Sequence, residues 1–225
     1  FTLKELFVIS PLGFVGAFFI GLVHSVIFGY GAVYAIAKGL SIFEISIFMV
    51  IVSIFGAIFQ WPVGFLSDRI DRRIILISVT LVASCLSVFI IISWYVSLVV
   101  FFIVLSFYAG MSLPMHSLAV AHTNDYLQPD EIVAASSSIN ILVGIGAIIG
   151  PIAVSLFMKI IGPDGFFVYI FIVHLLLGLF GLYRMGKRAK PSDIESQYVP
   201  LPRNISAAGM ELNPKVEPTE EKTSS

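Results

Sequence analysis

Residues 64–73 read GFLSDRIDRR and decide the fold, because they place five charged side chains between two long apolar runs. A charged residue at the centre of a bilayer costs on the order of 3 kcal/mol, so five would cost about 15 kcal/mol. This stretch must therefore lie in water. The apolar runs on both sides of it are predicted to be membrane-spanning helices.

The composition of the chain also indicates an integral membrane protein. Its 225 residues are 58% hydrophobic and only 12% charged, whereas soluble domains average about 25% charged residues. The formal net charge of −1 argues against a nucleic-acid partner. The single cysteine, Cys85, lies inside an apolar run, so no intrachain disulfide framework is expected. The expected fold class is an all-α membrane bundle in contact with the lipid bilayer.

Six stretches are long and apolar enough to cross a bilayer, which takes about 20 helical residues. These spans are predicted at residues 11–37, 42–65, 74–93, 98–121, 133–160 and 166–185. The apolar run from 74 to 121 must turn back once, because as one helix it would be about 72 Å long. Residues 1–10 are predicted to form an interfacial lead-in, and residues 187–225 a disordered tail.

Lys and Arg residues orient these spans. If both termini are cytoplasmic, eight basic residues near the membrane lie inside and only Lys38 and Lys159 lie outside. This distribution satisfies the positive-inside rule. The charged loop 64–73 is then cytoplasmic, and so is the loop that contains Asp125, Asp130 and Glu131.

Polar side chains within the spans are candidates for function, since ionisable groups are costly there. The candidate cavity or substrate contacts are His24, Tyr108, Ser112, His116 and Asn140. Three of them share one face of the fourth span, which Pro114 is expected to kink. Binding to a neighbouring helix explains His24 and His116 equally well, and for His174 it is the preferred interpretation.

Small residues recur at helical spacing in the first and fifth spans, where they would let two helices approach closely. The predicted helix-packing positions are Gly13, Gly21, Gly29, Gly144, Gly146, Gly150 and Pro151. The third and sixth spans are bulky and apolar almost all round, and they are expected to face lipid.

The charged loop resembles the G-x-L-S-D-R-x-D-R-R loop signature of the major facilitator superfamily. Residues 10–13, 60–63, 118–122, 144–151 and 198–203 are similar to the C-terminal half of a branch of bacterial permeases. The resemblance implies twelve helices in two six-helix bundles, with a small solute bound between them and moved by alternating access. This chain would then lack an N-terminal six-helix half, located in the same polypeptide or in a partner chain. It would lie in a bacterial inner membrane, and its start at Phe1 would reflect trimming or a longer polypeptide.

In such a transporter, the charged loop is expected to be a cytoplasmic gating loop made of Gly64, Asp68, Arg69, Asp71, Arg72 and Arg73. Gly64 would let two helix ends approach, and Asp68 would lie at the N-terminus of another helix. The arginines would bind carboxylates on the same side of the membrane, such as Asp125. The plainer alternative is that these charges only mark the cytoplasmic side.

Two other functions match parts of the sequence. A stand-alone half-transporter or assembly subunit would pair with itself or with a sister chain. A rhomboid-type intramembrane protease would use a serine in the fourth span and a histidine in the sixth, as Ser112 and His174 would provide. However, Leu113 replaces the usual glycine after the serine, so we expect no enzyme. The sequence contains no P-loop and suggests no cofactor or metal site.

Overall fold

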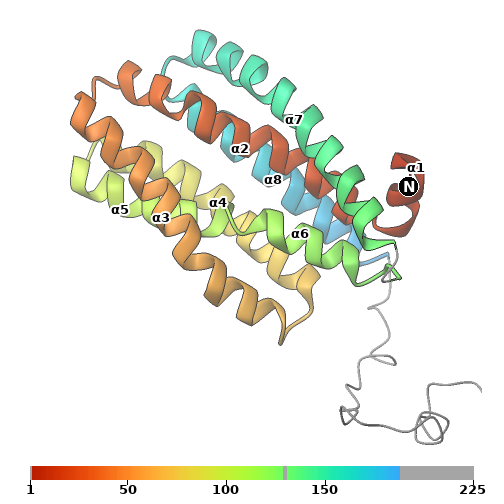
Figure 1. The fold of residues 1–225 in the computed structure, drawn as a ribbon. Helices are drawn as coiled ribbons and strands as arrows, with labels where there is room; N and C mark the ends of the chain where they lie inside the picture. The colour runs from red at the N-terminus through yellow and green to blue at the C-terminus, as the bar shows by residue number, and fades with distance from the viewer. Residues whose placement is uncertain (1, 129–130, 188–225) are drawn as a thin grey trace, which may run out of the picture. The chain divides into compact units, whose positions relative to one another are not determined.

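The computed structural model describes residues 2–128 and 131–187, and all the regular structure in these residues is α-helical. In this part of the chain, eight helices follow one another (Figure 1). They are α1 (Leu3–Ile9), α2 (Pro11–Ala37), α3 (Ile42–Ser67), α4 (Arg72–Trp94), α5 (Leu98–Ser112), α6 (Met115–Asn124), α7 (Ile132–Ile161) and α8 (Gly165–Met185). Helices α5 and α6 together make one span, so six spans are long and apolar enough to cross a membrane. The predicted all-α, six-span fold class is confirmed.

The ends of the six spans differ from the predicted ends by at most three residues. Local capping explains several of them: Ser10 accepts a hydrogen bond from the backbone of Gly13 at the start of α2, and Ser41 forms a capping box with Glu44 at the start of α3. Helix α1 lies within the predicted lead-in, whose interfacial position stays a prediction. Residues 188–225, nearly all of the predicted tail, lie outside the described residues.

Pro114 divides the fourth span. Helix α5 ends at Ser112 and α6 begins at Met115, because proline has no backbone N–H to donate and its ring opposes a continuous helix. Tyr108 and Ser112 therefore lie on α5, whereas His116 lies on α6 beyond the break.

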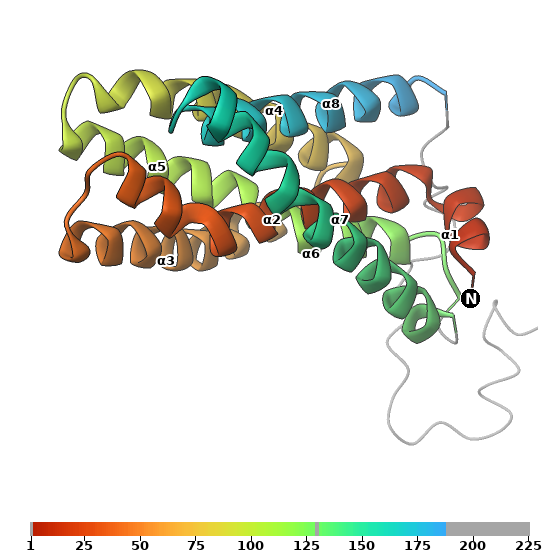
Figure 2. The ribbon, with the colours of Figure 1, turned by 90° about the horizontal axis from the view of Figure 1, so that it is seen from above.

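Helix α2 packs along α7, and α4 packs against α8 and α5. Figure 2 shows α7 crossing α2, with α4 and α8 side by side. The crossing is close because glycines face backbone: Gly21 faces Val143, Gly146 faces Phe18, and Gly150 faces Leu22. A side chain at any of these glycines would collide with the opposite helix.

The other predicted packing positions have different surroundings. Gly13 lies against the side chain of Thr123, whereas Gly29 and Gly144 face open space within the described part of the chain. Pro151 is accommodated inside α7, which runs on to Ile161. Thus only some of the small residues form contacts between the described helices.

Burial differs among the six spans, and the expectation that the third and sixth spans face lipid stays a prediction. In the most apolar window of each span, 50% of α4 and 56% of α8 is buried within the described bundle, close to the 56% of α2. The most exposed spans are α3 and α7, at 17% and 22%. Composition did not reveal this, because a leucine packs as well against lipid as against a helix.

We call the two ends of the bundle the loop end, where α3 meets α4, and the Lys38 end, where α2 meets α3. Near the Lys38 end, the helices are joined by fully buried aromatic rings, named here the aromatic core: Tyr34, Phe48, Phe101, Phe166 and Phe167. The Tyr34 ring lies 4.8 Å from Phe166 and 5.0 Å from Phe167. These rings come from α2, α3, α5 and α8, so the core joins most of the bundle.

Candidate functional site

The signature loop is mostly the ends of two helices. Helix α3 ends at Ser67 and α4 begins at Arg72, which leaves only Asp68 to Asp71 as the connection. Asp71 is the N-cap of α4 and accepts a hydrogen bond from the backbone N–H of Arg73 at 3.0 Å. A carboxylate is favourable there because the helix dipole is positive at its N-terminus. Within the loop, the acid that caps a helix of this bundle is therefore Asp71. Asp68 is the C-cap of α3 and binds Arg72, and its expected place at the N-terminus of another helix stays a prediction.

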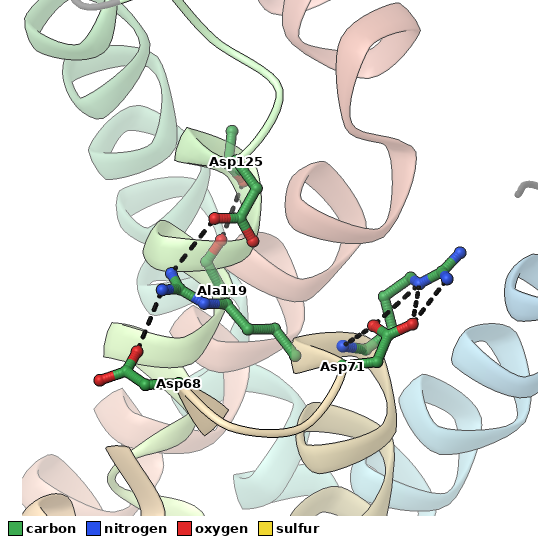
Figure 3. A network of polar contacts seen from close by, with 7 residues as sticks. Asp68, Asp71, Ala119 and Asp125 are labelled. Carbon is green, nitrogen blue, oxygen red and sulfur yellow. Dashed lines mark hydrogen bonds and ion pairs between the residues drawn. The ribbon is translucent and has the colours of Figure 1, made fainter. Parts of the chain in front are cut away.

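Arg72 is shared between two carboxylates (Figure 3). Its Nη2 lies 3.1 Å from Oδ1 of Asp68, and its Nη1 lies 3.4 Å from Oδ1 of Asp125. We call this arrangement the Arg72 fork, and it joins the ends of α3, α4 and α6. The Asp68 side chain is 70% exposed and that of Asp125 is 33% exposed. Ion pairs this open to water contribute only about 0–1 kcal/mol, so the fork is easily released.

Partial burial raises the pKa of Asp125 above its ordinary 3.8, with smaller contributions from the negative charges of Asp68 and Asp71. The positive charge of Arg72 acts in the opposite direction and lowers that pKa. The Asp125 carboxylate thus depends on Arg72 to offset the loss of water around it.

The other residues of the loop have separate contacts. Arg73 is buried and binds both oxygens of Asp71, with Nη2 at 2.7 Å from Oδ2. The guanidinium of Arg69 lies 4.0 Å from the centroid of the Phe65 ring. Gly64 faces open space within the described residues, so no described helix approaches it closely, and the close helix approach expected there stays a prediction.

Asp125, Asp130 and Glu131 were the carboxylates expected near the arginines, and within the described residues only Asp125 is seen to bind one. Glu131 accepts a hydrogen bond from the backbone of Gln128 in its own loop, at 2.9 Å. Asp130 lies outside the described residues.

A second polar group lies inside the bundle, at the break between α5 and α6. The backbone carbonyl of Ser112 ends α5, and Nε2 of His24 on α2 lies 3.3 Å from it. The hydroxyl of Ser112 lies 3.2 Å from Nε2 of His174 on α8, whose Nδ1 is 2.9 Å from the carbonyl of Ile170. We call these residues the His24–Ser112–His174 cluster.

The carbonyl partners assign the protons of both imidazoles. A carbonyl oxygen only accepts, so Nε2 of His24 donates to Ser112 and Nδ1 of His174 donates to Ile170. Nε2 of a neutral His174 then accepts the hydroxyl proton of Ser112. The side chains of Ser112 and His174 are buried. Ser112 joins α5 to α8 through His174 and to α2 through His24.

The remaining candidates are only partly brought together with this cluster. The Tyr108 ring meets His174 edge to face at 5.8 Å, and its buried hydroxyl faces Ser112 without the geometry of a hydrogen bond. His116 is half-buried on α6, and Asn140 is exposed on α7. His174 was not among the predicted site residues. Its only signal was the pairing of a serine in the fourth span with a histidine in the sixth.

Helices α3 and α7 expose polar side chains as well as apolar ones. Ser46, Ser53 and Gln60 are exposed on α3, and Ser137 and Asn140 on α7. The hydroxyls of the exposed serines donate hydrogen bonds to backbone carbonyls of their own helices. The hydroxyl of Ser53, for example, lies 2.9 Å from the carbonyl oxygen of Met49. Gly144 adds an open position next to Asn140. Polar and small residues on an exposed helix face are typical of faces that meet another helix or water.

Comparison with known proteins gives two matches. The family model described as Major Facilitator Superfamily matches residues 13–214. An uncharacterised MFS-type transporter of Bacillus subtilis, YfkF, is 31% identical over 163 residues, which are 71% of this chain and 40% of that protein. This chain thus covers less than half of that curated relative. No solved structure matches the chain.

Proposed function

This chain belongs to the Major Facilitator Superfamily, and from that premise we propose that it is one six-helix half of a transporter that moves a small solute by alternating access. Membership confirms the resemblance seen in the loop, and it identifies an integral membrane transport protein and not an enzyme. The hydrogen bond between Ser112 and His174 is accordingly interpreted as a tie between helices and not as a catalytic pair.

The observation that carries the half-transporter proposal is the exposure of α3 and α7. They are the least buried spans, at 17% and 22%, and they carry exposed polar side chains such as Gln60 and Asn140. Lipid is a poor environment for these groups. We infer that a second six-helix bundle, the N-terminal half, covers the two helices and leaves a solute pathway between the bundles. The match to 40% of a curated relative supports this.

The Arg72 fork is proposed to act in gating. It joins the ends of three helices through contacts that are mostly open to water, so its carboxylates can exchange partners as the bundles rock. We place the loop end and both ends of the segment in the cytoplasm of a bacterial cell, because Lys and Arg gather there. His24, Tyr108, Ser112, His116 and Asn140 remain the proposed cavity contacts.

Cross-linking in the full-length transporter tests the covering of α3 and α7. Single cysteines replace Ser53 on α3 or Ser137 on α7 in a Cys85→Ser background, and a second cysteine is scanned along the N-terminal half. We expect disulfides from both positions to that half. The matched control is a separate variant that keeps the native Cys85, exposed on α4, as the single cysteine of this chain; the same scan should give no disulfides from it. Links between two copies of the chain would favour the self-pairing alternative, and no links would refute a covered face.

Transport tests the gating proposal. Asp68→Asn in the full-length protein should reduce solute transport, because the fork loses one of its two carboxylates. Unchanged transport would refute a gating role for Asp68 and leave its charge as a marker of the cytoplasmic side.

A further inference from the structure

At the Lys38 end, one carboxylate serves two partners. Nζ of Lys38 donates to Oδ1 of Asp164 at 2.7 Å, and the hydroxyl of Tyr95 donates to Oδ2 of Asp164 at 3.0 Å. The hydrogen bond to Asp164 raises the pKa of Tyr95 above its ordinary 10.0, so this hydroxyl keeps its proton. Both carboxylate oxygens are therefore engaged within the chain itself.

The Lys38 ammonium is enclosed by aromatic rings as well. It lies 4.7 Å from the centroid of Trp94 and 5.2 Å from that of Tyr95, where the ring faces attract a cation. The Lys38 side chain is only 7% exposed and that of Asp164 22%. Removing one member of a pair this far from water leaves an uncompensated charge, which is much more costly than breaking an exposed pair.

The four residues come from three different connections. Lys38 follows α2 and precedes α3; Trp94 and Tyr95 lie where α4 turns into α5; and Asp164 lies between α7 and α8. The bonded residues are far apart along the chain, since Asp164 is 126 positions after Lys38. Since each connection joins two spans, this one set of contacts reaches all six spans.

The aromatic core lies directly beneath these contacts. The Trp94 ring, which covers Lys38, meets Phe101 of that core at 5.3 Å, and Phe101 lies 6.3 Å from Phe48. Tyr34 is on the last turns of α2, just before Lys38, and stacks on Phe166. The polar contacts and the apolar core thus restrain the same helix ends.

We propose that Asp164 is the hub of a clasp, made with Lys38, Trp94 and Tyr95, that holds the three connections of the Lys38 end as one rigid unit, so that the bundle deforms only at its loop end. The clasp is complete within this chain and needs no second bundle. The inference goes beyond the proposed function and stands or falls separately from it. The alternative is that these side chains only anchor the helix ends at the membrane interface.

Hydrogen–deuterium exchange of the full chain in lipid nanodiscs separates the two explanations. Asp164→Asn keeps the side-chain shape but removes the negative charge that pairs with Lys38, and its amide NH2 cannot accept the hydroxyl proton of Tyr95, so both arms of the clasp are weakened. We expect exchange to become about tenfold faster in all three connections at once, because they lose a shared restraint. A rise confined to the α7–α8 connection, or no rise, would overturn the clasp.

Two further variants keep the test informative. Tyr95→Phe removes only the hydrogen bond from Tyr95 to Asp164. The increase in exchange rate should therefore be smaller and centred on the α4–α5 connection. This variant replaces Asp164→Asn in the test if Asp164→Asn fails to fold. Asp68→Asn is the matched control at the loop end, and it should leave exchange in all three connections unchanged. A rise there in the control would show general loosening of the bundle and would contradict a clasp that is specific to the Lys38 end.

Discussion

The two ends of the bundle use the same chemistry with different results. At each end, a basic side chain meets a carboxylate from another connection: Lys38 meets Asp164, and Arg72 meets Asp125. The side chains of Lys38 and Asp164 are 7% and 22% exposed, whereas Arg72 is 27% exposed and its two partners are 70% and 33% exposed. Water therefore screens the second arrangement more than the first. The comparison teaches that burial, and not the number of charges, decides which end of this bundle is held firmly.

The largest effect should come from the aromatic core. Phe101→Ala removes a fully buried ring that contacts Tyr34, Phe48 and Trp94. We expect the free energy of unfolding to fall by about 3–5 kcal/mol, since the cavity left there cannot collapse. Reversible unfolding in mixed micelles measures this loss. Trp61→Ala, at a side chain 76% exposed near the loop end, is the control and should change little; equal losses would remove the contrast between the ends.

The next effect tests the crossing of α2 and α7, which lies between the two ends. Gly146→Leu places a side chain against the backbone of Phe18 and Leu22, and overpacking of this kind costs about 1–3 kcal/mol. Gly144→Leu, two residues away, enters open space and should be tolerated in this chain. Thermal unfolding of the two variants compares them. A Gly144 variant that is equally destabilised would show that the bundle packs differently from this structure.

A smaller effect concerns pH at the loop end. Asp125 has a raised pKa in the folded chain, so its contribution to stability is fully present below about pH 4 and is lost as the pH rises through the folded pKa. Arg72→Gln removes the charge that lowers this pKa, and should therefore raise the pKa further and extend the loss to higher pH. The temperature midpoint of unfolding, measured between pH 4 and 8 for the unaltered chain and for Arg72→Gln, follows this loss of stability. Asp125→Asn should flatten this part of the profile, and an unaltered profile in both variants would contradict the assignment.

The smallest effect on stability is expected at Asp68. Its carboxylate is largely in water and Arg72 retains Asp125, so Asp68→Asn should change the free energy of unfolding by less than about 0.5 kcal/mol. The same substitution is expected to reduce transport in the full-length protein. Unfolding and transport measured on one preparation show whether the two effects separate. A large loss of stability would mean that the loop end is held more firmly than its exposure indicates.

Much of the fold was predictable from local sequence. The spans were found because the bilayer sets a minimum apolar length, and their limits follow from caps such as Ser41 and from charges such as Asp71. The break at Pro114 follows from its missing N–H. The loop signature indicated the family, which the match over residues 13–214 confirms.

The candidate site was predicted only in part. His24, Tyr108 and Ser112 were identified as polar residues in apolar spans, and the structure places them around one break. His174 was expected only to bind a neighbouring helix, and it does lie 3.2 Å from Ser112 on α5, but that contact with the candidate residues was not predicted. A residue's neighbours along the chain say little about its neighbours on another helix.

The sequence by itself therefore determined how many described helices are long and apolar enough to cross a membrane, nearly where those helices begin and end, and which family the chain belongs to. Each of these depends on the order of residues along a single helix or loop. Only the tertiary structure decided that α3 and α7 are the exposed spans and that Lys38 meets Asp164, 126 positions away. Such contacts depend on how six similar apolar helices choose their neighbours, and apolar surfaces that pack equally well on lipid or protein carry no label for that choice.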